Sequence, residues 1–188
     1  MNRIRYIAVL VAVGALAACT SPTGLIDAVT TPAEDRSFAD STADAEIKLA
    51  IDKGMLDNSG QLYVDVNTVV YEGRVLLTGK VATQQAHDTA ERIAHQTKNV
   101  KEVINELVVT TDRDFGAGVN DIAIEVKIKA QLVATKDIKS INYRWRSVGG
   151  TVYLIGAAQS KAELASVVEV IRRIDGVRKV VNYARVRA

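Results

Sequence analysis

The residues whose side chains could do chemistry are few, and their spacing argues against a catalytic metal. His87, Glu91 and His95 recur at intervals of four residues, so on a helix they would form one stripe that could hold an ion. The two histidines would lie two turns apart, roughly 12 Å. The His-Glu-x-x-His spacing of zinc enzymes is missing. We interpret the stripe as a solvated polar face and predict no metal site.

A glycine-bounded segment has some likeness to a phosphate-binding loop. Its two glycines, Gly73 and Gly79, enclose five residues where such a loop has four. Val81 stands where a Ser or Thr would bind magnesium, and the sequence contains no Gly-x-Ser-x-Gly elbow. We therefore predict no catalytic residues and no cofactor, and we expect a protein that is not an enzyme.

The remaining reactive side chain is Cys19, the only cysteine among 188 residues. It follows a basic start and an uncharged run of twelve residues, Ile7 to Ala18, which is too short to span a membrane but suits a signal-peptide core. The sequence Leu16-Ala17-Ala18-Cys19 resembles a bacterial lipobox, which implies cleavage before Cys19 and acylation of that residue. We predict a signal peptide over 1–18 and lipidation of Cys19. The alternative is an ordinary cleaved signal with a cysteine beside the cut.

Residues 19–41 are rich in Ser, Thr, Ala, Asp, Gly and Pro, with few large apolar side chains. This composition predicts a lipidated N-terminus followed by a flexible tether, whose root-mean-square span would be about 25 Å. Thr20 rather than Asp follows the cysteine, and by the usual lipoprotein sorting rule this favours the outer membrane.

An internal repeat decides the expected architecture. A shift of 77 residues aligns 44–109 with 121–186 without a gap, and eleven of the 66 pairs are identical. Most of the identities fall at apolar and glycine positions, as a shared core requires. We infer two small units that together form one α+β body, because a lone unit of this size would be marginally stable.

Both units predict the element order αββαβ. Ser41 and Asp44 are expected to cap the first helix, whose apolar positions are Ile47, Leu49, Ile51 and Leu56. In the second unit, Asn120 or Asp121 precedes the apolar positions Ile124, Ile128, Leu132 and Val133.

Alternating side chains then predict a half-buried strand in each unit, through Leu62, Val64 and Val66 or Ile141, Tyr143 and Trp145. A glycine turn leads to a second strand, then to a helix over 83–97 or 159–174, and to a last strand over 102–110 or 177–186. Core candidates on these later helices are Ala90, Ile93, Ala94, Val167, Val170, Ile171 and Ile174.

Two pairs of segments carry a family resemblance, namely Gly73-Arg-Val-Leu-Leu-Thr-Gly79 with Val100-Lys-Glu-Val-Ile-Asn105, and Gly150-Thr-Val-Tyr-Leu-Ile-Gly156 with Gly176-Val-Arg-Lys-Val-Val-Asn182. They resemble BON domains. The resemblance implies two tandem BON domains, 42–110 and 120–188, joined by a linker over 111–119. Each would have two helices packed on a small three-stranded mixed sheet.

With the lipobox and tether, this arrangement is similar to the division- and outer-membrane-stress-associated lipid-binding lipoproteins. That similarity implies a non-catalytic periplasmic protein that binds anionic phospholipid and supports outer-membrane integrity, with lipid contact centred on the second repeat.

The composition itself, with 48% hydrophobic and 24% charged residues, excludes a disordered chain and a polytopic membrane protein. The formal net charge of +2 conceals a separation along the chain. Residues 44–109 carry 7 basic and 10 acidic residues, or −3, whereas 121–186 carry 12 basic and 6 acidic, or +6. Such a basic module in the periplasm would meet anionic lipid headgroups, and we expect no nucleic acid. The alternative is a solvated basic face, or one that docks against the first repeat.

The first helix of the second unit is the main candidate for lipid contact. Its core side would carry Ile124 and its equivalents, while the candidate phospholipid-binding residues lie on an adjoining face: Ile122, Val126, Lys129 and, near the edge, Lys127. Apolar side chains beside lysines suit insertion at the headgroup boundary. Alternatively, Ile122 and Val126 pack against the first repeat. Lipid-binding relatives can carry a bulky aromatic near this helix start, where this chain has Ala123.

The single tryptophan, Trp145, stands between two arginines, as an interfacial anchor would. Strand alternation places it with Ile141 and Tyr143, which favours the core or its edge. We expect a protein held at the periplasmic face of the outer membrane by acylated Cys19, with anionic phospholipids as partners. The alternative function is a periplasmic adaptor that binds envelope proteins and no lipid.

Overall fold

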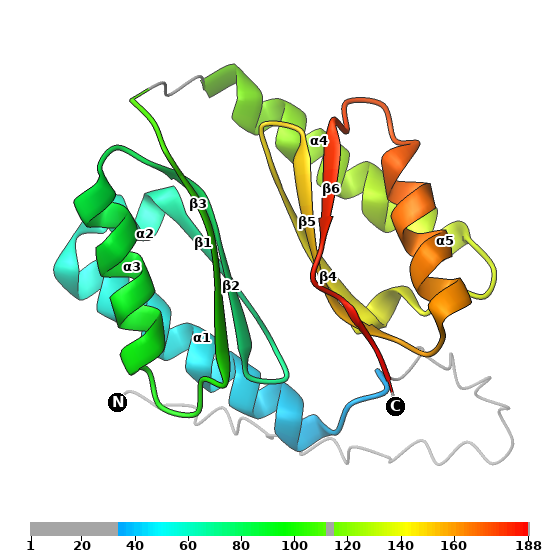
Figure 1. The fold of residues 1–188 in the computed structure, drawn as a ribbon, viewed down its shortest axis with the longest axis horizontal. Coiled ribbons are helices and arrows are strands. Elements are labelled where there is room, and N and C mark those ends of the chain that lie inside the picture. Colours follow the sequence, from blue (N-terminus) through cyan, green and yellow to red (C-terminus); the bar gives the residue numbers. More distant parts are fainter. Residues whose placement is uncertain (1–33, 112–114, 188) are drawn as a thin grey trace, which may run out of the picture. The chain divides into compact units, whose positions relative to one another are not determined.

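The computed structural model describes residues 34–111 and 115–187, which belong to one compact unit, Pro32–Ala188. Two successive α+β units follow one another along the chain (Figure 1). The first comprises α1 (Phe38–Asn58), α2 (Gly60–Asp65), β1 (Val66–Tyr71), β2 (Arg74–Val81), α3 (Gln84–Gln96) and β3 (Glu102–Val109). The second comprises α4 (Phe115–Ala134), the 3-10 turn η1 (Ser140–Asn142), β4 (Tyr143–Val148), β5 (Thr151–Ala158), α5 (Lys161–Arg172), β6 (Lys179–Asn182) and β7 (Arg185–Val186).

The three-stranded mixed sheet expected for each repeat is found in the first, and the second repeats its topology but adds β7 as a fourth strand. In each, an antiparallel hairpin (β1–β2 or β4–β5) is followed by a helix, and the next strand returns parallel to the second hairpin strand. The strand orders are β1-β2-β3 and β4-β5-β6, with the short β7 also pairing with β5. The predicted α+β class with mixed sheets is confirmed.

The first helix of each repeat begins earlier than predicted. Ser37 caps α1 and forms a reciprocal capping box with Asp40, so residues 38–41 are helical and not part of a tether. Likewise α4 begins at Phe115, inside the expected linker. Ser41 and Asp44 are therefore not the capping pair, because a complete capping box was already available four residues upstream.

Asp44 and its repeat equivalent Asp121 instead bind the hairpin turns. The Asp44 carboxylate accepts the backbone N–H groups of Glu72 and Gly73 at 2.7 and 2.8 Å. Asp121 accepts those of Gly149 and Gly150 at 2.6 and 2.8 Å. Each carboxylate thus ties the first helix of its repeat to the turn of the hairpin beneath it.

The segment before β1 is helical where alternation predicted a strand. Ser59 accepts the N–H groups of Gln61 and Leu62 and so starts the short helix α2. Leu62 is buried and Val64 is exposed, so the two residues lie on different faces of this short helix. Their spacing in the sequence resembles the alternation of a strand, which explains the wrong prediction. In the second repeat, Ile141 lies in η1 and only Tyr143 and Trp145 belong to β4.

Each repeat has its own core between its helices and one face of its sheet (Figure 1). The first contains Ile47, Ile51, Val75, Leu77, Ala90 and Ala94, and the second contains Ile124, Ile128, Leu132, Val152, Leu154, Val167 and Ile171. Three other apolar positions of the first helices, Leu49, Leu56 and Val133, are exposed. They follow the helical period but lie on a second face.

The opposite faces of the two sheets share a third apolar cluster. Its buried members are Val69, Tyr71, Leu76 and Ile104 from the first repeat, and Tyr153, Ile155 and Ala157 from the second. Polar bonds at its rim also join the repeats: Arg74 donates to the Tyr183 carbonyl at 2.8 Å, and Arg185 pairs with Glu102 at 2.7 Å. Tyr183 donates to Glu106, and burial together with that carboxylate raises the pKa of Tyr183 to about 12. The two sheets are thus one packing unit.

Among residues 34–111 and 115–187, no helix is both long enough and apolar enough to cross a membrane.

Gly79 and Gly156 have to be glycines. A Cβ on Gly79 would lie 2.1 Å from the Asp65 carbonyl oxygen, and its φ is +136°. We expect Gly79→Ala to lower the free energy of unfolding by at least ~2 kcal/mol, through backbone strain and overpacking. Gly60→Ala is the control, because a Cβ there meets nothing within 4 Å; it should change stability by less than about 0.5 kcal/mol. Urea titration measures both, and equal effects would contradict this account.

Candidate functional site

Helix α4 carries two apolar stripes, of which the fold buries only one. Ile124, Ile128 and Leu132 are the buried stripe, at intervals of four residues. A second stripe, which we call the outer stripe, consists of Val119, Ile122, Val126 and Val133 and is 63 to 70% exposed. Lys129 lies in the same row, between Val126 and Val133. A surface helix normally has one apolar face, which packs against the core. The outer stripe is a second apolar face of α4, and it is exposed to solvent.

A groove lies beside the outer stripe, between α4 and the segment from η1 to β4. It has a volume of about 580 Å³. One wall is formed by Ile122, Val126, Lys129 and Val133 of α4, and the other by Ile141, Arg144, Trp145 and Arg146. We call this the α4–β4 groove. Its lining combines apolar side chains with three cations.

Glu125 fixes one end of the groove. Its carboxylate accepts the Ser147 N–H at 2.9 Å and pairs with Arg146 at 3.0 Å, while its carbonyl accepts the Trp145 indole N–H at 3.3 Å. These three bonds join α4 to β4 side by side. Trp145 packs at the edge of the second core, as strand alternation predicted, and its other side lines the groove.

Three of the four predicted lipid-contact residues come together in the groove lining, namely Ile122, Val126 and Lys129. Ile122 and Val126 are 65 and 63% exposed, so they do not pack against the first repeat. Lys127 lies apart from them, because its ammonium group is 3.6 Å from the Asp175 carboxylate. Lys129 pairs with no carboxylate of the described residues.

Sequence reasoning missed the cations of the opposite wall. Arg144 and Arg146 precede and follow Trp145 in the sequence, and alternation would send them away from the helices. Both still reach the groove, because β4 is the edge strand and the groove follows its unpaired side. The sequence feature that could have indicated these two cations is the run Arg144-Trp145-Arg146.

The segment from Glu34 to Arg36, which we call the strap, joins this site to the first repeat. Glu34 accepts from Arg144 at 3.1 Å, and Arg36 pairs with Glu34 and with Asp44. Asp35 accepts from Lys139, from Asn142 at 2.7 Å and from Gln159 at 2.8 Å. The strap therefore holds the η1 end of the groove against α1.

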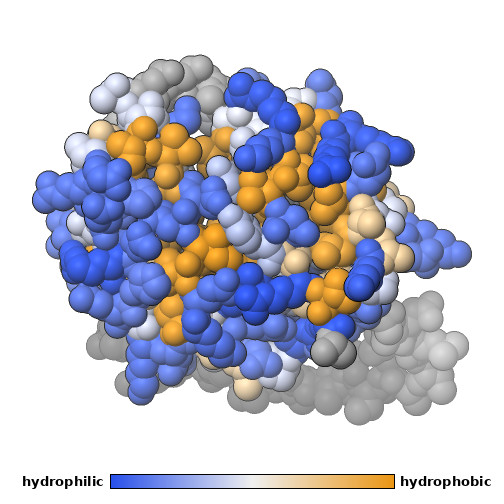
Figure 2. All heavy atoms as spheres, viewed as in Figure 1, coloured by the Kyte–Doolittle hydropathy of each residue, from blue (hydrophilic) through white to orange (hydrophobic). Residues whose placement is uncertain are grey.

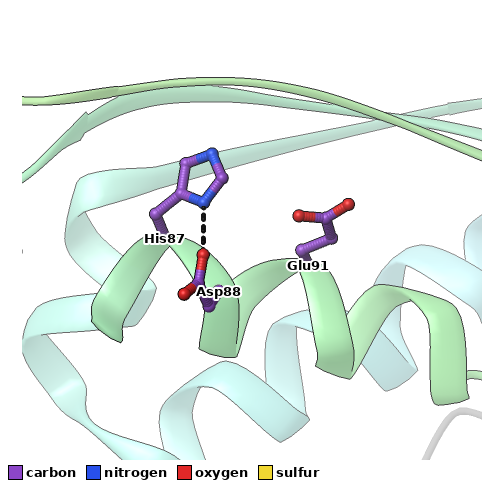
Figure 3. A group of neighbouring side chains, drawn as sticks. All are labelled: His87, Asp88 and Glu91. Atoms are coloured by element: carbon purple, nitrogen blue, oxygen red, sulfur yellow. Dashed lines mark hydrogen bonds and ion pairs between the residues drawn. The ribbon is translucent and has the colours of Figure 1, made fainter. Parts of the chain in front are cut away.

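The histidine stripe of the first repeat forms a polar cluster on α3 (Figure 3). Ligand atoms of His87, Asp88 and Glu91 lie within 4.8 Å of one another. His87 and Asp88 are in contact at 2.9 Å, and Glu91 accepts from Asn105 at 3.1 Å. These side chains are partly or fully exposed and already have protein partners, so they stabilise the helix surface and give no independent sign of an ion.

Some predicted features lie outside the described residues. They are Cys19, the signal peptide over 1–18 and residues 19–33 of the expected tether.

Hydrophobic side chains are unevenly distributed over the surface of the molecule. On the face drawn in Figure 2 they gather in patches among hydrophilic ones. The described residues thus form an α+β protein of two repeated units with a groove between α4 and β4.

Comparison with known proteins identifies the repeats. The model of the BON domain matches residues 43–111 and again 120–188. The chain therefore belongs to the BON-domain family, and the predicted pair of BON domains is confirmed.

Three relatives are informative. An uncharacterized protein of the gshII 5′ region of Anaplasma centrale is 43% identical over 145 residues, covering 77% of this chain and 95% of that protein. The outer membrane lipoprotein DolP of Haemophilus influenzae is 31% identical over 145 residues, covering 76% and 72%. A 21 kDa hemolysin of Actinobacillus pleuropneumoniae is 34% identical over 119 residues, covering 62% and 60%.

The strap gives a prediction of pH dependence. Hydrogen bonds from Lys139 and Asn142 lower the pKa of Asp35 from 3.8 to about 2. The ionised carboxylate therefore favours the folded state above about pH 4, and this contribution is lost as the pH falls towards 2. We expect Asp35→Asn to unfold at lower denaturant than the parent at pH 7, with the difference shrinking between pH 4 and pH 2. A difference that stays constant over that range would contradict the assignment.

Proposed function

We propose that this protein is a non-catalytic envelope protein whose second BON domain binds anionic phospholipid through the outer stripe and the cations of the α4–β4 groove, and so supports outer-membrane integrity. The observation that carries the proposal is the exposed row of four aliphatic side chains on α4 with Lys129 in the same row. The likeness to an outer membrane lipoprotein supports an outer-membrane-associated role.

An anionic lipid surface would complement both the aliphatic side chains and the cations of this site. The aliphatic side chains would leave water for the acyl boundary, where full burial of a Val or Ile side chain is worth about 1.5–3 kcal/mol. Lys129, Arg144 and Arg146 would remain at headgroup level, where each cation adds about 1 kcal/mol on an anionic surface. Salt weakens the electrostatic contribution of the cations but not the contribution of apolar burial.

The same positions of the first repeat do not make this surface. By the shift of 77 residues, Ile122, Val126 and Lys129 correspond to Ala45, Leu49 and Asp52. Asp52 is acidic and already pairs with Lys48. Arg144 and Arg146 correspond to Asn67 and Val69, and Val69 is buried between the sheets. The proposal therefore assigns lipid contact to the second repeat.

We further propose that acylated Cys19 anchors the chain to the outer membrane on its periplasmic side. The motif ending in Cys19 supports this, as does the likeness to the outer membrane lipoprotein of Haemophilus influenzae. Fourteen residues separate Cys19 from Glu34, and Glu34 pairs with Arg144 of the groove.

A second candidate function is a protein-binding adaptor. It is favoured by exposed apolar side chains elsewhere, above all Phe38 of α1 and Val64 of α2, which are 88 and 73% exposed. These lie on the first repeat and are less regularly spaced than the outer stripe.

Val126→Glu tests the lipid proposal. It places a carboxylate in the middle of the outer stripe, and because Val126 is exposed the fold should be unaffected. We expect co-sedimentation with phosphatidylglycerol or cardiolipin vesicles to weaken about tenfold or more, since charge repulsion and lost insertion together exceed about 1.4 kcal/mol.

Leu49→Glu is the matched control, because Leu49 is the equivalent position of α1 and is 71% exposed. It should leave vesicle binding within about twofold of the parent. Equal losses in the two variants would move the contact away from α4. Failure of the parent to bind such vesicles at any salt concentration would refute lipid binding altogether.

Cys19→Ala tests the anchor. We expect the variant to be found as a soluble chain or an unprocessed precursor, because two or more acyl chains are needed for stable anchoring. Partitioning of the mature chain into detergent measures this. Mature Cys19→Ala that still enters the detergent phase would contradict acylation at this residue.

A further inference from the structure

We propose that the α4–β4 groove holds one acyl chain of an anionic phospholipid, with the phosphate at the cations along its rim. This inference rests on the proposed function and goes beyond it, since a helix face that dips into a membrane needs no groove. It predicts that a single lipid molecule binds in water, with no bilayer present.

The groove has the form that a chain requires. Its volume of about 580 Å³ lies within the range of small-molecule sites. Val126 and Val133 form one apolar side, and Ile141 and Trp145 form the other. Val126, Val133 and Ile141 are exposed, so a chain lying between them would cover surface that the fold leaves in contact with water.

The charges around the groove select the kind of headgroup. Lys129, Arg144 and Arg146 line it with a single acid, Glu125. Glu125 is already engaged by Arg146 and the Ser147 N–H, and Arg144 by Glu34. Lys129 has no such partner among the described residues, so it is the cation most available to a phosphate. An anionic amphiphile complements this lining, whereas a zwitterionic one would bring a second cation beside it.

The walls are held in place before any ligand binds. The Glu125 bonds fix Trp145 and Arg146 against α4, and the strap fixes η1 and Arg144. A lipid would therefore meet a preformed site and would not have to order a loop.

Trp145 makes the proposal directly measurable, because it is the only tryptophan of the chain and lines the groove. The probe is lysophosphatidylglycerol with a brominated acyl chain, kept below the concentration at which it forms micelles. The protein is the chain from Thr20 onward, which retains the compact unit Pro32–Ala188. We expect saturable quenching of Trp145 fluorescence with one lipid bound per chain.

Two variants, each with a matched control, locate the site. Val126→Glu should abolish the quenching, and Leu49→Glu should not. Lys129→Glu should weaken binding about tenfold, whereas Lys136→Glu, an equal charge change at an exposed lysine of the same repeat outside the groove, should have less than about a threefold effect. Equal effects of the two lysine variants would overturn the phosphate position.

Other lipids identify the occupant. Brominated lysophosphatidylcholine should bind about tenfold more weakly, and equal binding would overturn selection by charge. Brominated stearate that binds as tightly as the lysophospholipid would assign the groove to free fatty acids and overturn the phospholipid. Binding of an extended peptide along β4 that the lysolipid cannot displace would assign it to a protein partner.

Failure of this inference and failure of the proposed function give different results. Vesicle binding without quenching by the monomeric lipid would overturn the groove and leave membrane contact by α4 intact. Loss of both would overturn the proposed function as well.

Discussion

Each sheet of this protein has two apolar faces, and the helices of its own repeat cover only one of them. In an isolated repeat the other face would be exposed to water. The lost free energy of apolar burial would leave a domain of this size marginally stable. The two repeats solve this by packing sheet on sheet, with Val69 and Leu76 against Tyr153 and Ile155. This contact buries the second face of each sheet. The surfaces that remain for binding a partner are therefore mainly the outer sides of the helices.

The same constraint explains why two repeats of one fold differ in their surfaces. Their cores are matched position by position, and Asp44 and Asp121 hold equivalent hairpin turns. Outside the cores the repeats diverge, with a balance of −3 in 44–109 and +6 in 121–186. The outer stripe on α4 and the cations of β4 belong to the second repeat alone. Under the proposed function, the first repeat supplies the packing partner and the second would supply the surface that contacts lipid.

Much of this was predictable from the sequence, and the failures have physical reasons. The shift of 77 residues matched Gly79 with Gly156 and apolar positions with one another, so the repeat and the element order along each unit could be predicted. Val64 was misassigned to a strand, because a short amphipathic helix can show the same alternation of apolar side chains as a strand. The groove could not be predicted as a unit, because it depends on β4 being an edge strand and on Glu125 reaching across to Arg146.

The central claim is that anionic lipid contacts the second repeat at α4 and β4. The most direct measurement is an NMR titration of the isotope-labelled chain with phosphatidylglycerol micelles, with amide shifts followed across both repeats. The account predicts shifts confined to α4, to the segment from η1 through β4, and to the strap that bonds to it. Shifts spread evenly over both repeats, or centred on α1 and α2, would contradict it.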